Sequence, residues 1–210
     1  QDWQVDEGRV ICTEVSERLP MRTLHLLTAY LDGEFTLEVT TGTINTDLPS
    51  SENAWSGVLI GAGNIDIDHR LTALTHHVPA TDGGYIAGVD HNGEVFLRKN
   101  VLPVGGTSLW SINTKISPDD LPLVEPIRRR GDGFGKKGRR PVRLKLNSAL
   151  DQGTHGFLPS FRMEAIDIGT NEILSYALYD FSYYFPHHGS FALVSHHGPE
   201  GATAGHWFDD

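Results

Sequence analysis

A short hairpin signature in the middle of the chain constrains the fold most. Two strand-like runs, 85–89 and 94–98, are separated by Asp90-His91-Asn92-Gly93. Asn-Gly supplies the positive φ angles of a two-residue turn, so the sequence predicts two antiparallel strands with a tight connection. The apolar, glycine-bounded residues 55–60 and the alternating residues 69–75 predict two more strands in this central block.

The same period-two alternation recurs along the whole chain. In residues 34–41, Phe35, Leu37 and Val39 are predicted to point inward, with Thr36, Glu38 and Thr40 outward. A hairpin is predicted over Ile168-Gly169-Thr170-Asn171. Further strands are predicted at 8–17, 22–31, 108–114, 141–146, 161–167, 172–180, 190–195 and from 205 onward.

Many short strands without a helix predict an all-β fold, a two-sheet antiparallel jelly-roll sandwich. The carboxy-terminal strand is expected to pair beside the first strands. With 210 residues, the chain is expected to form a single β-sandwich domain over 1–210. Its longest apolar run is far below the roughly twenty residues of a membrane-spanning helix, so no membrane span is predicted.

Positive charge is concentrated in one segment. Nine of the 17 basic residues lie between Arg128 and Lys145, and the chain as a whole carries a net charge of −10. The rest of the chain is strongly acidic, so nucleic acid is excluded as a partner of the domain body. Residues 116–140 hold three prolines and four glycines and show no period, which predicts a long, exposed basic loop.

Several segments together resemble a known family. These are RTLHLLTAYLDGEFTLEVT, AWSGVLIGAG, GGYIAGVDHNGEVFLRKN, SFRMEAIDIGTNEILSYAL, FALVSHHG and HWFDD. They resemble the concanavalin A-like (laminin G-like) jelly-roll domain of secreted bacterial proteins, in the version that precedes alkaline phosphatase D-type metallophosphatase domains. The resemblance implies a secreted or periplasmic bacterial protein with a C-terminal catalytic domain as its partner. A first residue other than methionine, Gln1, agrees with removal of an export signal or upstream segment.

Two kinds of metal site were weighed from the residues. The three His-His pairs do not predict zinc, because neighbouring residues of a strand point to opposite faces and offer a metal one imidazole. The turn residues Asp66 and Asp68, with the terminal Asp209, carry the oxygen ligands that calcium prefers. The resemblance implies that calcium sits in some of these sandwiches, so calcium is an expected cofactor. The alternative is ordinary turn capping.

Rings beside polar groups in the central block predict a sugar-binding face, since rings stack on sugar C–H faces while polar side chains bond the hydroxyls. The alternative is that the rings belong to the core. The predicted ligand-binding residues are Trp55, His76, His77, Tyr85, Arg98 and Trp110.

The leading functional hypothesis is a non-catalytic, lectin-like module that binds polysaccharide or another glycan. One alternative is a polysaccharide-degrading lyase or hydrolase, in which His77, Tyr85 and Arg98 would be the catalytic group. The paired-carboxylate strand of jelly-roll glycosidases is absent from the sequence, so no catalytic residue is assigned. A further alternative is a structural spacer.

Overall fold

The computed structural model describes the chain as strands and turns, and the described residues contain no α-helix. These residues are 3–13, 21–44, 54–62, 84–99, 122–135, 140–151, 158–180, 188–196 and 205–209. Among them, no helix is long and apolar enough to cross a membrane. The strands are β1 (Trp3–Asp6), β2 (Arg9–Cys12), β3 (Met21–Asp32), β4 (Phe35–Thr43), β5 (Trp55–Ala62), β6 (Tyr85–Asp90), β7 (Val95–Lys99), β8 (Arg128–Gly131), β9 (Val142–Asp151), β10 (Leu158–Asp167), β11 (Ile173–Asp180), β12 (His188–His196) and β13 (His206–Asp209).

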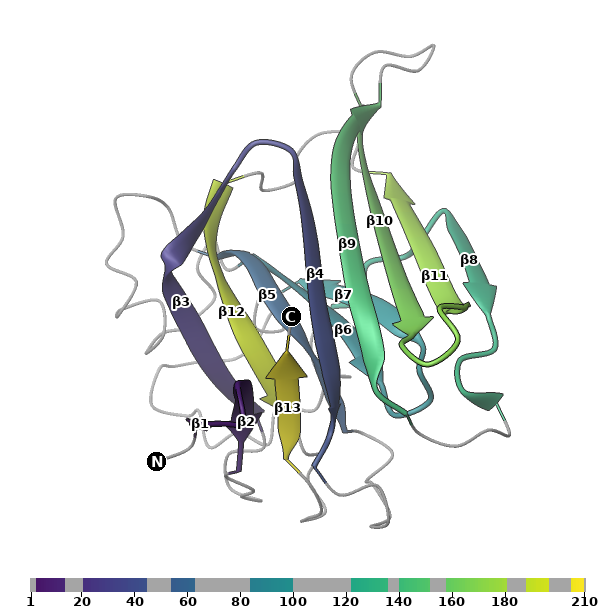
Figure 1. The fold of residues 1–210 in the computed structure, drawn as a ribbon. Coiled ribbons are helices and arrows are strands. Elements are labelled where there is room, and N and C mark those ends of the chain that lie inside the picture. The colour runs from purple at the N-terminus through teal and green to yellow at the C-terminus, as the bar shows by residue number, and fades with distance from the viewer. Residues whose placement is uncertain are drawn as a thin grey trace.

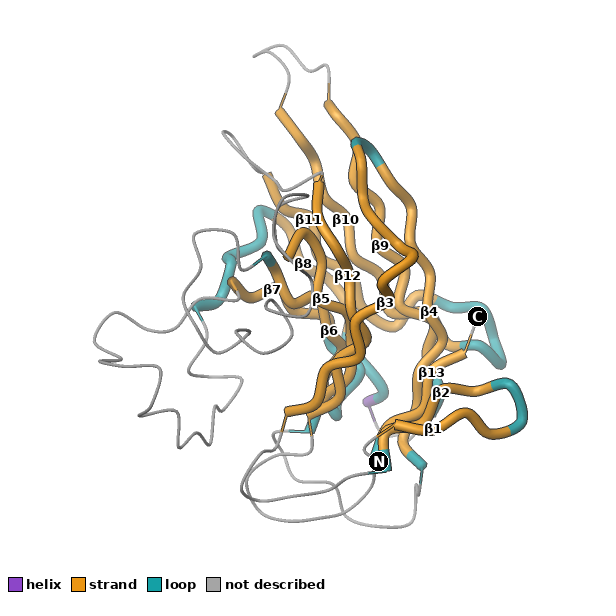
Figure 2. Tube along the Cα trace, turned by 90° about the vertical axis from the view of Figure 1, so that its left-hand side faces the viewer, coloured by secondary structure: helices purple, strands orange, loops and turns teal. Residues whose placement is uncertain are grey.

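The strands form two layers that pack face to face (Figures 1 and 2). One is an eight-stranded sheet in the order β1-β2-β13-β4-β9-β10-β11-β8, and the other is a five-stranded sheet in the order β3-β12-β5-β6-β7. All pairs of neighbouring strands are antiparallel. The prediction of an all-β, two-sheet antiparallel sandwich is confirmed.

The C-terminal strand β13 closes the eight-stranded sheet. It lies between β2 and β4, so that Trp207 is opposite Ile11 on one side and Gly42 on the other. Figure 1 shows β13 beside the short N-terminal strands. The expected pairing of the last strand with the first ones is confirmed.

Alternating side chains fill the space between the sheets, as the period-two pattern requires. In β9, Val142, Leu144 and Leu146 are at most 2% exposed and face Val58 and Ile60 of β5 within one core cluster. Strand β4 follows its predicted pattern, because Val39 is buried, Phe35 and Leu37 pack against the core, and Thr36 and Glu38 are exposed. Thr40, which was predicted to point outward, is also largely buried.

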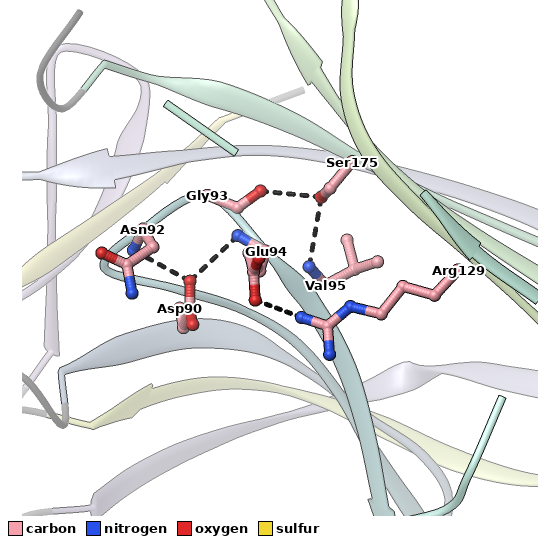
Figure 3. A network of polar contacts seen from close by, with 7 residues as sticks. All are labelled: Asp90, Asn92, Gly93, Glu94, Val95, Arg129 and Ser175. Carbon is pink, nitrogen blue, oxygen red and sulfur yellow. Dashed lines mark hydrogen bonds and ion pairs between the residues drawn. The ribbon is translucent and has the colours of Figure 1, made fainter. Parts of the chain in front are cut away.

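The predicted tight connection between β6 and β7 is present, but it is not the two-residue Asn-Gly turn with positive φ at both positions. Only Gly93 has positive φ (+81°), and its N–H bonds the Asp90 carbonyl at 3.0 Å, so the turn is centred on His91 and Asn92. Asp90 fixes this turn, because its Oδ1 accepts hydrogen bonds from the backbone N–H groups of Asn92 (2.8 Å) and Glu94 (2.9 Å) (Figure 3). An Asp side chain that bonds its own turn in this way is a common turn device.

The predicted β10–β11 hairpin is also present. Asp167 ends β10, and its Oδ1 accepts hydrogen bonds from the N–H groups of Gly169 (2.8 Å) and Thr170 (3.1 Å). Asn171 adopts φ +58°, a left-handed conformation that Asn tolerates better than most residues.

The basic segment differs from the predicted loop. Residues 128–131 form β8, which pairs with β11 at the edge of the eight-stranded sheet. Just before it, Val124 donates to the Leu97 carbonyl and Lys99 donates to the Pro122 carbonyl, so residues 122–124 run along β7 of the other sheet. The period-two pattern missed β8 because all four of its residues are exposed and none carries a core side chain.

This segment, 122–135, therefore joins the two sheets at one edge. The buried Ser175 hydroxyl of β11 donates to the Gly93 carbonyl (2.7 Å) and accepts from Val95 N–H (3.2 Å), while Arg129 of β8 pairs with Glu94 (Figure 3). Phe134 N–H then bonds the Asn92 carbonyl, and the Phe134 ring enters the core.

The N-terminus also differs from its prediction. Strands β1 and β2 form a hairpin with Glu7 and Gly8 at positive φ, where a single strand over 8–17 was predicted. The predicted strands at 69–75 and 108–114 lie outside the described residues.

Candidate functional site

Trp55, the first predicted sugar-binding ring, is enclosed. It begins β5 on the outer face of the five-stranded sheet and is 3% exposed. Its ring stacks on His196, with centroids 5.1 Å apart and planes at 4°, and meets the edge of Phe96 at 5.3 Å. The faces of this indole are therefore occupied by protein, as the core alternative predicts.

Tyr85 and Arg98 do not share a face with each other. Arg98 is opposite Ile86 and lies over the Phe96 ring, on the outer side of the five-stranded sheet. Tyr85 precedes Ile86 and packs against the cluster between the sheets. Because adjacent strand residues point to opposite sides, these two groups cannot act on one reacting atom. The other predicted ligand-binding residues, His76, His77 and Trp110, lie outside the described residues.

Of the predicted calcium ligands, only Asp209 lies in the described part of the chain. Its Oδ2 is 3.4 Å from Nε of Arg9. Asp66 and Asp68 are outside the described residues. Within the described ranges, no group of three or more His, Cys, Asp or Glu side chains is placed to hold a metal ion.

A hollow on the outer face of the eight-stranded sheet is a candidate site that the sequence did not indicate. We call it the Trp207 hollow; its volume is about 370 Å³. The Trp207 ring lies between the backbone of Gly42 and the Arg9 guanidinium, whose central carbon is 4.3 Å from the ring centroid. The residues that line the hollow are Arg9, Thr40, Arg143, Ile168, Asn171, Trp207 and Asp209.

Arg143 is held in place on the floor of this hollow. Its Nη2 donates to Asn171 Oδ1 at 2.7 Å, and its Nε lies 3.7 Å from Glu38 Oε2. Glu38 also accepts from Lys145 at 2.7 Å, and this hydrogen bond lowers the pKa of the Glu38 carboxyl, helped by the positive charges of both neighbours. The hollow therefore combines a fixed guanidinium, an amide, a hydroxyl and a carboxylate beside an indole.

A second cavity lies between the sheets, near the β6–β7 turn. We call it the Arg140 cavity; its volume is about 40 Å³. Arg140 Nη1 pairs with Oδ2 of the buried Asp167 at 2.6 Å. The cavity is lined by Thr41, Gly42, Thr43, Ala54, Trp55, Ser56, Val89, Asp90, His91, Phe134, Arg140, Val142 and His206.

Two polar pairs complete the wall of the Arg140 cavity. Thr41 Oγ1 is 2.9 Å from Ser56 Oγ, and the Nδ1 of the buried His206 is 2.8 Å from Ser195 Oγ. The two groups of each pair satisfy each other, whereas Nδ1 of His91 and Nε and Nη2 of Arg140 have no hydrogen-bond partner among the described residues.

The two candidate sites lie on opposite sides of the eight-stranded sheet and need different explanations for being missed. Arg143 could have been found, because the alternation of residues 142–146 already sets it outward. Trp207 could not, because the short strand HWFD has two aromatic residues at adjacent positions and gives no indication of which one faces solvent. A scan against protein-family models and a search of curated proteins both returned no match to this chain.

Proposed function

We propose that this chain is a non-catalytic, lectin-like module that binds a glycan in the Trp207 hollow. The main support for this proposal is the size of the hollow. Its volume of about 370 Å³ is within the usual range of small-ligand sites and suits one or two sugar rings. Its lining pairs an indole with donors and acceptors of both charges, the combination that sugar hydroxyls and C–H faces require.

Each wall of the hollow has a role in this proposal. Arg143, fixed by Asn171, donates to ring hydroxyls, and Asp209 accepts from them. The Trp207 indole provides the apolar contact. The Arg9 guanidinium lies over this ring and is about half exposed, so it can move aside or stack on the ligand itself.

Affinity electrophoresis on gels that contain alginate, polygalacturonate, xylan or a β-glucan tests the proposal. The protein should be retarded by at least one of these polymers. Trp207→Ala should abolish the retardation, and Arg143→Ala should weaken binding roughly tenfold or more, as loss of a central contact does. Tyr176→Ala, which alters the same face outside the hollow, is the matched control and should bind as the parent does.

Absence of retardation on every polymer would overturn the proposal, as would equal binding by the parent and Trp207→Ala. Circular dichroism of each variant separates lost binding from lost folding.

The proposal extends to the protein's family and setting. The two-sheet sandwich and the closing position of β13 support a concanavalin A-like jelly roll of the laminin G type. In that setting, the module is exported by a bacterium and attached to a phosphatase-type hydrolase. Sequencing the gene on both sides of this segment checks this: a hydrolase domain downstream supports it, and its absence contradicts the attachment.

A further inference from the structure

The Arg140 cavity gathers hydrogen-bond donors that lack an acceptor. The buried nitrogens without a hydrogen-bond partner in the described part of the chain include His91 Nδ1 and Nε and Nη2 of Arg140. Both residues line this cavity. Buried donors in native proteins almost always have a partner, so the cavity is built for something that accepts hydrogen bonds. We propose that it binds a carboxylate group.

The Arg140 guanidinium has two N–H groups that would each bond one acceptor atom of a ligand. Nη1 is already used by Asp167, which leaves Nε and Nη2 free of partners among the described residues. These two N–H groups lie on the same edge of the planar guanidinium, and their spacing matches the two oxygens of a carboxylate.

His91 adds a further nitrogen to the lining of this cavity, and a histidine Nδ1 donates in one neutral tautomer and in the charged form. The Trp55 indole is not one of these donors, because its ring is stacked on His196 on the outer face of the five-stranded sheet. The next residue, Ser56, is the one that contacts Thr41 between the sheets.

The size of the cavity agrees with this ligand. The cavity volume of about 40 Å³ has room for about three water-sized positions at 10–15 Å³ each, the number of heavy atoms in a carboxylate group. Larger ligands would need to place only their carboxylate inside.

The carboxylates near the cavity are bonded elsewhere and do not occupy the free N–H groups of Arg140. Asp167 is already paired with Arg140, and Oδ1 of the cavity-lining Asp90 accepts two backbone N–H groups of its own turn. His206 is bonded to Ser195 through Nδ1. Asp90 is one of the lining residues, and its negative charge weakens the attraction for an anion, so an affinity in the millimolar range is expected for a small carboxylate.

Ligand-observed NMR with acetate is the test, at ionic strength held constant with sodium chloride. Saturation transfer to acetate should be seen with the parent protein. Glucuronate and glucose serve as further probes, because a carboxylate could come from a free small acid or from an acidic sugar. Loss of the acetate signal when glucuronate is added identifies an acidic sugar as a source, an acetate signal that glucuronate leaves unchanged identifies a free small acid, and glucose should have no effect.

Two variants test the site. Arg140→Lys keeps the charge beside Asp167 but removes the fork, and His91→Phe keeps an aromatic ring but removes Nδ1. Each should weaken acetate binding by about tenfold or more, as loss of a hydrogen bond to a charged group does. The matched control, Arg162→Lys, lies outside the cavity and should bind as the parent does.

The absence of acetate transfer in the parent would overturn the proposal, as would transfer that persists unchanged in both cavity variants. A high-resolution crystal structure grown with acetate gives an independent result: acetate on the Arg140 fork supports the proposal, and water alone contradicts it. These outcomes are separate from the glycan proposal, since the Trp207 hollow is on the other side of the sheet and is read out with polymers.

Discussion

The outer faces of the two sheets contrast with each other. On the eight-stranded sheet, outward residues such as Thr36, Asn147 and Arg162 are exposed to solvent. On the five-stranded sheet, the outward residues form a second apolar cluster, whose members are at most 3% exposed. They are Trp55, Leu59, Ile86, Ala192 and Val194. Among the described strands, the outward apolar residues of β5, β6 and β12 are therefore buried, whereas the outward residues of β4, β9 and β10 are exposed or half-buried at most positions.

This difference is visible in the strand sequences. Strand β9 alternates strictly over Val142 to Leu146, as a half-buried strand does. Strand β5, WSGVLIGA, is almost continuously apolar, the pattern of a strand buried on both faces. A ring within such a run is part of a packed layer, and this explains why Trp55 offers no open face.

Each outer face also has an aromatic ring lying on a glycine. Phe96 covers Gly88 on the five-stranded sheet, and Trp207 covers Gly42 on the eight-stranded sheet. A Cβ at Gly42 would lie 2.7 Å from Trp207 Cζ2, and a Cβ at Gly88 would clash with the Phe96 ring. Neither glycine has positive φ, so the missing side chain, and not the backbone conformation, makes room for the ring.

The largest expected effect tests burial of the five-stranded sheet's outer face. Leu59 is 1% exposed, so Leu59→Ala should lower the free energy of unfolding by about 2–5 kcal/mol through lost burial and a cavity. Thr36→Ala, on the exposed face of the other sheet, should change it by no more than about 0.5 kcal/mol. Urea unfolding measures both, and similar small effects would contradict the contrast between the faces.

An intermediate effect is expected from filling the two glycine positions. Gly88→Ala should reduce stability by about 1–3 kcal/mol, because Phe96 can move only by losing its edge contact with Trp55. Gly42→Ala should reduce it by less than about 1 kcal/mol, because Trp207 can swing toward solvent. Thermal melting ranks the variants, and tryptophan fluorescence should report a displaced Trp207 only in Gly42→Ala. The reverse ranking would show that the eight-stranded face is the more tightly packed one.

The smallest effect concerns the ionic groups of the exposed face. The lowered pKa of Glu38 means that its ionised form stabilises the folded state at neutral pH. Since the pair with Lys145 is about one-third exposed, Glu38→Gln should reduce stability by only about 0.2–1 kcal/mol at pH 7.

The pH dependence of this small effect has a definite sign. The difference between parent and Glu38→Gln should be complete above the ordinary carboxyl pKa of 4.5 and vanish as pH falls through the lowered pKa of the folded protein. Added salt should also reduce it. Urea titrations from pH 7 to pH 3 measure this, and a difference that does not change with pH would exclude Glu38 ionisation as its cause.

The sequence was sufficient to predict the two-sheet sandwich but not all of its strands. Alternation in β4 and β9, and the Asn92-Gly93 pair, predict strands and connections that the structure contains. Strand β8 was missed because an edge strand made of arginines has no apolar period, and its pairing depends on β11, which is distant in sequence.

The candidate sites were less predictable, for a reason that applies to sandwiches in general. Composition gives the residue types, but moving a side chain by one position along a strand transfers it from the core to an outer face. Tyr85 and Arg98 seemed suited to one site, yet strand pairing sets them on opposite faces. Arg9, Arg143 and Trp207 come from three separate strands and meet only because β13 inserts beside β2.

Strand β8 has a consequence for how the protein behaves at high concentration. It ends the eight-stranded sheet, so one row of its backbone groups has no neighbouring strand among those described. If two molecules joined there in a continuous sheet, Arg128, Arg129 and Arg130 of one copy would face the same three side chains of the other. Repulsion between these cations opposes such edge-to-edge growth, and this sheet is protected from assembling into fibres at that border.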